Sequence, residues 1–164
     1  MSIQALPVGP RQERTFRVDL SKHEYTNAKV NIDFGAYSIP VYTLEMIALE
    51  KLRAICQQMP AYGFRGKRTQ RARDFYDIHL IVSERGINLG GEENRSLMHH
   101  IFEAKRVPLE LLWQIADHRE FHRGDWPSVL DAVGGVAESY DFYFDFVLDQ
   151  VEKLKPFWVK DAPL

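Results

Sequence analysis

The sequence predicts an α+β fold, in which a small antiparallel sheet at the N-terminus is followed by a bundle of five or six helices. Apolar and polar side chains alternate over residues 28–34, which is typical of a strand. From residue 44 onwards, apolar side chains instead recur at the helical period. We therefore expect a strand-rich part over residues 1–42 and a helical domain over residues 43–164.

The N-terminal part contains three candidate strands after an irregular lead-in over residues 1–11, which is interrupted by prolines. Residues 15–20 alternate, and residues 28–34 alternate more regularly. Gly35 breaks this pattern, and residues 37–42 can form a third short strand. The apolar face of the middle strand carries Val30, Ile32 and Phe34. We expect these strands to form one edge of a small sheet.

Residues 44–56 are predicted to form an amphipathic helix with Thr43 as its N-cap. At 100° per residue, one arc carries Leu44, Ile47, Ala48, Leu52, Ala54 and Ile55. Lys51 falls in the middle of this arc. An unpaired buried ammonium is strongly unfavourable, so Lys51 requires a carboxylate, a phosphate or a water-filled cleft beside it.

A second helix, beginning near Arg73, offers carboxylates for that lysine. Its apolar face carries Phe75, Ile78, Ile81 and Val82. Asp74 projects from the same face, and Asp77 lies at its edge. Two interpretations remain open: a buried structural ion pair, or a polar cleft in which Lys51 holds a phosphate and Asp74 positions it.

The segment between these helices contains a run of cations without an acidic residue. Its members are Arg65, Lys67, Arg68, Arg71 and Arg73. Such a run is often a solvated loop, but this one leads into the start of the helix that carries Asp74, where backbone N–H groups favour anions. Cations in this place suit a polyphosphate or a nucleic-acid backbone.

The rest of the chain predicts further helices over residues 92–105 and 109–115, and a last one over residues 136–154 with an aromatic stripe. Leu97, His100 or Ile101, and Ala104 are expected to point inward from the first of these. His118 and His122 are spaced i, i+4, but no third metal ligand is evident, so packing or capping at a turn is favoured over a metal site.

Composition sets limits on the function. A chain of 164 residues with 45% hydrophobic and 27% charged residues suits one globular domain. The net charge of −2 excludes a global attraction to nucleic acid, so any such contact must be local. A single cysteine, Cys56, fits a reducing cytoplasm, and no apolar run is long enough to cross a membrane. We expect a cytoplasmic protein.

Two spaced motifs resemble those of a known family. Residues 45–54 read Glu-Met-Ile-Ala-Leu-Glu-Lys-Leu-Arg-Ala, and residues 73–77 read Arg-Asp-Phe-Tyr-Asp. They resemble the paired motifs of the AbiEii/AbiGii-type nucleotidyltransferases, which are toxins of abortive-infection, type IV toxin–antitoxin systems. The family pattern is E-K-L-x-A on a helix, a variable basic segment, and then R-D-x-x-D. Residues 105–126 resemble the later part of such proteins, and the whole resemblance spans about residues 28–155.

The resemblance implies the C-terminal part of a polymerase-beta-like nucleotidyltransferase. An intact relative would transfer a nucleotidyl group from an NTP, with Mg²⁺, to an acceptor such as tRNA, and would have a cognate antitoxin. Lys51 would contact the triphosphate, and Asp74 or Asp77 would orient it or act as the base. The phosphate-binding or acceptor-binding cations would be Arg65, Lys67, Arg68, Arg71 and Arg73.

The sequence departs from the family upstream of these motifs. Relatives carry a Gly-Gly/Ser segment and an Asp-x-Asp pair that bind metal and nucleotide, and nothing before Val30 resembles them. We therefore expect a truncated or degenerate member. Asp33 resembles a further carboxylate of the superfamily and is a candidate metal ligand. One carboxylate holds Mg²⁺ poorly, so we expect neither tight Mg²⁺ or NTP binding nor nucleotide transfer by this chain alone. The competing hypothesis is a non-catalytic module that binds nucleic acid or a partner protein.

Overall fold

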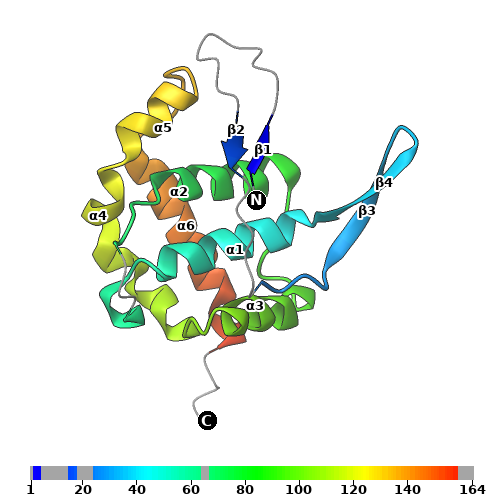
Figure 1. The fold of residues 1–164 in the computed structure, drawn as a ribbon. Coiled ribbons are helices and arrows are strands. Elements are labelled where there is room, and N and C mark those ends of the chain that lie inside the picture. Colours follow the sequence, from blue (N-terminus) through cyan, green and yellow to red (C-terminus); the bar gives the residue numbers. More distant parts are fainter. Residues whose placement is uncertain (1, 5–14, 18–23, 64–66, 159–164) are drawn as a thin grey trace, which may run out of the picture.

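The computed structural model describes residues 2–4, 15–17, 24–63 and 67–158, and it has the expected α+β order of strands followed by helices (Figure 1). The strands are β1 (Ser2–Gln4), β2 (Thr15–Arg17), β3 (Lys29–Phe34) and β4 (Tyr37–Tyr42). The α-helices are α1 (Leu44–Cys56), α2 (Ala72–His79), α3 (Glu93–Ala104), α4 (Arg119–Arg123), α5 (Trp126–Ala132) and α6 (Tyr140–Leu154). Short 3₁₀ segments are η1 (Pro60–Tyr62), η3 (Leu109–His118) and η4 (Lys155–Phe157), and a π-helical segment, η2 (Leu80–Glu84), continues α2.

The strands form two separate antiparallel hairpins. β1 pairs with β2, and β3 pairs with β4 from Lys29 opposite Tyr42 to Phe34 opposite Tyr37. The predicted third strand is therefore confirmed as β4. The expectation of an irregular lead-in was wrong at Ser2–Gln4, because these residues pair with β2 rather than remaining outside the sheet structure.

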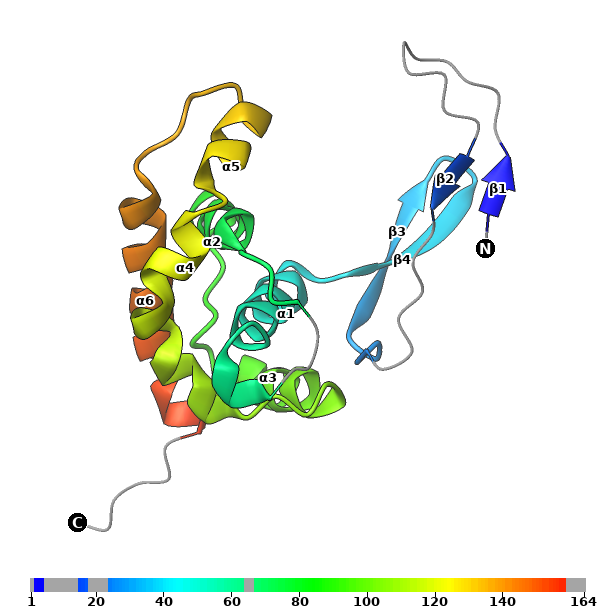
Figure 2. The ribbon, with the colours of Figure 1, turned by 60° about the vertical axis from the view of Figure 1, so that its left-hand side comes forward.

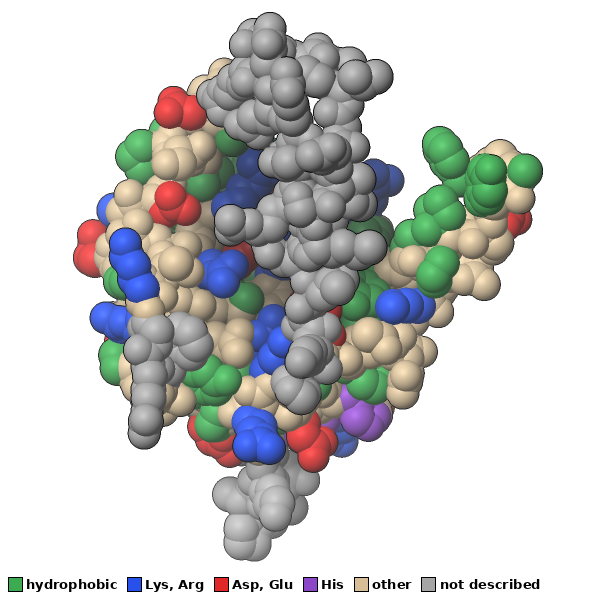
Figure 3. Space-filling model, viewed as in Figure 1, with side chains coloured by type: hydrophobic (Ala, Val, Ile, Leu, Met, Phe, Trp, Pro, Cys, Tyr) green, Lys and Arg blue, Asp and Glu red, His purple; other side chains and the backbone are tan. Residues whose placement is uncertain are grey.

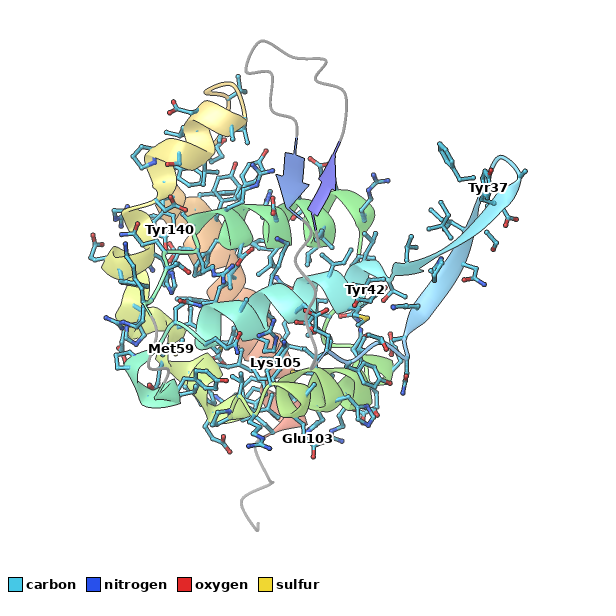
Figure 4. All side chains as sticks on the ribbon, viewed as in Figure 1. Tyr37, Tyr42, Met59, Glu103, Lys105 and Tyr140 are labelled. Carbon is cyan, nitrogen blue, oxygen red and sulfur yellow. The ribbon has the colours of Figure 1, made fainter. Side chains whose placement is uncertain are left out.

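The β3–β4 hairpin projects away from the helical body (Figures 1 and 2). The alternation correctly predicted that Val30, Ile32 and Phe34 share a face, and the register adds their cross-strand partners Ile39 and Tyr37. These five side chains are between 41% and 74% exposed, and apolar atoms line the hairpin in Figure 3. Figure 4 shows Tyr37 near the tip and Tyr42 at the base, beside α1. The alternation thus predicted which side chains share the apolar face of the hairpin, but not that this face is exposed.

Helix α1 lies at the centre of the helical body and packs against α2, α3 and η3. The Thr43 Oγ1 accepts a hydrogen bond from the backbone N–H of Met46 at 3.2 Å, which confirms the predicted N-cap. Leu44 is exposed, whereas Met46 and Leu49, which are outside the predicted arc, are fully buried. The predicted arc was displaced, because Ile47, Lys51 and Ala54 within it are only half-buried and the side that carries Met46 and Leu49 faces the core.

Helix α6 closes the body behind α1 and α2, as Figure 1 shows. The predicted aromatic stripe is confirmed as buried: Tyr140, Tyr143, Phe144, Val147, Val151 and Leu154. Phe75 of α2 stacks on Phe144 with ring centroids 4.9 Å apart. Helix α2 is thus held between α1 and α6, which fixes the direction in which its carboxylates point.

The remaining helices follow the prediction with three changes. The last helix, predicted over residues 136–154, begins at Tyr140, because the Ser139 side chain caps it by accepting a hydrogen bond from the Phe142 N–H. His100 is exposed and stacks on Tyr25, while Ile101 takes the inward position on α3. The predicted helix over residues 109–115 is a 3₁₀ segment that extends to His118. After helix α5, the Gly135 N–H donates a hydrogen bond to the Leu130 carbonyl and caps the end of the helix. This cap requires a positive φ, which Gly134 and Gly135 both have. No helix in the described ranges is long and apolar enough to span a membrane.

Candidate functional site

Lys51 of α1 donates hydrogen bonds to two carboxylates of α2. Its Nζ lies 2.9 Å from Asp74 Oδ1 and 2.8 Å from Asp77 Oδ2. The two aspartates are on one side of α2 because they are three positions apart in the sequence, which is close to one helical turn. The predicted pairing of Lys51 with Asp74 is confirmed, and Asp77 is a second partner of equal closeness.

This cluster is only partly shielded from water. The side chains of Lys51, Asp74 and Asp77 are 23%, 12% and 21% exposed. Burial alone would lower the pKa of Lys51, but the hydrogen bonds and charges of Asp77 and Asp74 outweigh it and raise the pKa above its ordinary value. Lys51 is therefore protonated at neutral pH, and its charge joins α1 to α2.

Two arginines from the basic run also face these carboxylates. The Arg73 Nε donates to Asp77 Oδ1 at 2.7 Å, and Arg71 Nη1 lies 3.7 Å from Asp74 Oδ2. Three cations therefore surround two carboxylates. We call these five residues the Lys51 cluster, and their formal charges sum to one positive charge.

A cavity of about 260 Å³ opens beside the cluster. It is lined by Glu24, Tyr42, Ile47, Glu50, Lys51, Ala54, Arg71 and Asp74. Within the described residues, Asp74 Oδ2 and Arg71 Nε are buried without a hydrogen-bond partner. Lys51 donates two of the three protons that an ammonium carries. Lys51 therefore keeps one ammonium proton for a polar ligand, and the cavity wall also carries the carboxylates of Glu24 and Glu50, the second of which is paired with Arg53.

His122 binds the backbone of the Lys51 cluster at Arg71. It is fully buried on α4, and its Nδ1 accepts a hydrogen bond from the Arg71 N–H at 3.1 Å. Its ring also packs against Phe75 at a centroid distance of 5.4 Å. The expected packing role is confirmed, but the partner lies 51 residues earlier in the chain. The local sequence around His122 gave no signal for this contact.

The electrostatic surroundings of His122 keep its ring neutral. Burial, and then the electrostatic effect of the neighbouring His118, Arg71 and Arg68, lower the pKa of His122 from the usual 6.5 to about 4. A neutral ring with an accepting Nδ1 carries its proton on Nε2, and that atom has no hydrogen-bond partner among the described residues.

The other cations of the basic run line a second hollow of about 460 Å³. It is formed by Lys67, Arg68, Thr69, Gln70, Phe121 and Asp125. The Arg68 guanidinium lies 4.8 Å above the Phe121 ring. The sequence predicted one phosphate-binding run, whereas the structure divides it between the Lys51 cluster and this second hollow. Arg65 lies outside the described residues.

The described residues contain no group of metal ligands that fits a magnesium site. Asp33 is exposed on β3, opposite Ser38 and one pair from the end of the hairpin. Among the described residues, no three acidic, histidine or cysteine side chains come together as metal ligands. Asp74 and Asp77 are instead paired with cations, and the 164-residue sequence contains no Asp-x-Asp. Asp33 thus belongs to no such group within the described residues, and its role as a metal ligand stays a prediction.

We predict that Lys51 and Asp74 are coupled energetically. Because the pair is partly exposed, Lys51→Ala and Asp74→Ala should each lower the free energy of unfolding by about 1–3 kcal/mol, between the values typical of surface and buried pairs. The double variant should cost less than the sum. Urea unfolding of the four proteins measures this, and the exposed Arg95–Glu92 pair on α3 is the matched control, with coupling near zero. Additive effects at Lys51 and Asp74 would show that the charges do not meet.

We predict that His122 makes the protein sensitive to acid. The folded state binds the His122 proton more weakly than the unfolded chain does, so its contribution to stability is full above pH 6.5 and falls as the pH drops towards about 4. The loss should reach up to about 3 kcal/mol. His122→Gln keeps an acceptor for Arg71 but does not titrate, so its unfolding free energy should vary less over this range.

Urea unfolding of the wild type and His122→Gln at several pH values between 4 and 7 measures this pH dependence. The exposed His100→Gln serves as the control and should leave the pH dependence as in the wild type. An unchanged pH dependence in His122→Gln would contradict a neutral, buried His122.

Comparison with known protein families identifies the family to which the chain belongs. The sequence model of the family described as "Nucleotidyl transferase AbiEii toxin, Type IV TA system" matches residues 3–150, which includes the Lys51 cluster, the second hollow and the hairpin. Neither the curated proteins nor the solved structures contain a significant match to this chain. Since the match extends over most of the sequence, the chain belongs to the AbiEii family of nucleotidyl transferase toxins of type IV toxin–antitoxin systems.

Proposed function

We propose that the Lys51 cluster binds the triphosphate of an NTP in a nucleotidyl transfer to an acceptor nucleic acid such as tRNA in the cytoplasm. Lys51 and Arg71 contact the phosphates, and Asp74 orients the reacting groups or takes the proton of the acceptor hydroxyl, with Asp77 as the alternative base. Membership of a toxin family from type IV toxin–antitoxin systems implies a cognate antitoxin.

The observation that carries this proposal is the unused hydrogen-bonding capacity beside the 260 Å³ cavity. A purely structural ion cluster would be expected to satisfy its buried polar atoms internally. Here Asp74 Oδ2 and Arg71 Nε are buried and have no hydrogen-bond partner within the described residues, and the residues to which they belong line the cavity. A phosphate oxygen can accept from Arg71 and Lys51, and an acceptor hydroxyl can donate to Asp74.

The cluster suits the charge changes of this reaction. Negative charge spreads over the phosphate oxygens and onto the leaving group during nucleotidyl transfer, and fixed cations that are already in place stabilise it. His122 supports this arrangement, because its hydrogen bond fixes the backbone at Arg71. Mg²⁺ would supply further charge neutralisation when bound, but the described residues offer no ligand set for it. We expect transfer to need metal-binding carboxylates in addition to Asp33, because the sequence contains no Asp-x-Asp pair.

A non-catalytic role is the second candidate, and one observation favours it. Both Lys51 hydrogen bonds are short, and Arg73 already occupies the second oxygen of Asp77. A cluster of this kind also stabilises the α1–α2 contact without any ligand. The helical body would then serve as a module that binds nucleic acid or a partner protein through its other cations.

We predict weak, salt-dependent binding of a labelled NTP that depends on Lys51. Losing a charge-assisted hydrogen bond costs about 1.5–3 kcal/mol, so Lys51→Met should weaken NTP binding about tenfold or more. Equilibrium titration at low salt, with Arg71→Met as a second variant, measures the change. Lys153→Met removes an exposed cation on α6 and should leave binding unaltered.

The outcome separates the two candidates. If Lys51→Met remains folded and binds NTP as the wild type does, the Lys51 cluster is a structural clamp and the proposal fails. If the wild type binds no NTP at low salt, the proposal fails as well. Labelled nucleotide transferred to tRNA by this chain alone, and abolished by Asp33→Ala, would instead show that Asp33 belongs to a working metal site.

A further inference from the structure

We propose that the second hollow is a binding site for single-stranded nucleic acid, in which one base stacks on Arg68 and Phe121 and the adjoining phosphates contact Lys67 and Arg68. The volume of about 460 Å³ is within the range of small-ligand sites. The identification of this strand as the acceptor of the transfer rests on the proposed function, whereas binding itself requires no NTP.

The charges of the hollow favour a phosphate backbone. In the described part of the chain, Lys67 forms no ion pair, and Arg68 makes only a 3.4 Å hydrogen bond to the carbonyl of Gln58 and its ring contact. Both side chains are exposed. This differs from Arg119 and Arg123 nearby, which are neutralised by Asp141. Lys67 and Arg68 are therefore available for phosphates, although the whole protein carries a net charge of −2.

The aromatic ring makes single strands the favoured partner. The Arg68 guanidinium lies 4.8 Å above the ring of half-buried Phe121, while the His122 ring meets Phe121 edge to face at 4.9 Å. The ring is thus held in place by a buried neighbour, and the charge of Arg68 lies close to it. Unpaired bases stack on aromatic rings and on guanidinium planes, whereas the bases of a duplex are not accessible for this.

The polar side chains of the hollow add a preference among bases. Asp125 has no ion-pair or hydrogen-bond partner for its carboxylate among the described residues, and Thr69 and Gln70 line the same space. A carboxylate accepts hydrogen bonds from exocyclic amino groups, as in contacts to cytosine N4. Uracil has no such group. We therefore expect cytosine, or another base with an amino group, to bind more tightly than uracil.

The hollow adjoins the Lys51 cluster through the chain itself. Residues 67–70 lead directly to Arg71, whose side chain faces Asp74 and whose backbone is held by His122. His122 in turn follows Phe121, the stacking ring. A strand bound in the hollow is thus next to the residues that we assign to the triphosphate, as an acceptor must be.

The test uses fluorescently labelled six-nucleotide RNAs, oligo(C) and oligo(U), titrated with the full chain at several salt concentrations. Lys67→Ala/Arg68→Ala should weaken binding of oligo(C) about tenfold or more and reduce the salt slope by about 1.4, since each phosphate contact to a single strand contributes about 0.7. Phe121→Leu should weaken binding about fivefold or more with the slope unchanged. Asp125→Asn should reduce the preference for oligo(C) over oligo(U).

The matched control is Arg85→Ala/Lys153→Ala, which removes two exposed cations from other elements. If it weakens binding as much as Lys67→Ala/Arg68→Ala, the attraction is diffuse and there is no site. No binding of oligo(C) at low salt, equal binding by a folded Phe121→Leu variant, or equal binding of a duplex would each overturn the proposal. NTP binding that is lost in Lys51→Met but kept in Phe121→Leu tests the proposed function separately.

Discussion

The ammonium of Lys51, shared between Asp74 and Asp77, is the interaction on which the rest of the site depends. It connects the two helices that form the centre of the body, and it cannot be removed without leaving two carboxylates close together with only arginines to balance them. An apolar contact could join α1 and α2 equally well, since replacing buried ion pairs by hydrophobic residues is often neutral or stabilising. The cluster, with its unused hydrogen-bonding capacity, therefore suggests a use beyond stability.

The distribution of the remaining cations follows from this constraint. Arg71 and Arg73 lie at the start of α2 and turn to its carboxylates, while Lys67 and Arg68 point into a separate hollow beside Phe121. Arg71 lies between the carboxylates of the Lys51 cluster and the second hollow, and His122 holds its backbone in place through a hydrogen bond. A run of cations in the sequence thus becomes two adjacent sites, which suits a reaction between two phosphate-bearing substrates.

Much of this arrangement could be predicted from periodicity. The helical period placed Lys51 and Asp74 on apolar faces, and the cost of burying either charge alone implied that they meet. Periodicity could not predict the exposure of Val30 and Phe34, because a pattern identifies a face but not what covers it. The contacts of His122 with Arg71 and of Arg68 with Phe121 join residues about fifty positions apart, and only the packing of α4 against the start of α2 brings them together.

The most direct test of whether Lys51 binds phosphate as well as Asp74 and Asp77 is urea unfolding with and without inorganic triphosphate. A ligand that binds only the folded protein stabilises it progressively as its concentration rises above Kd. We expect triphosphate to stabilise the wild type, Lys51→Ala to abolish this effect, and the coupling between Lys51 and Asp74 to become weaker when triphosphate is present. Equal stabilisation of the wild type and Lys51→Ala, or no stabilisation of either, would contradict the assignment of the Lys51 cluster as a phosphate site.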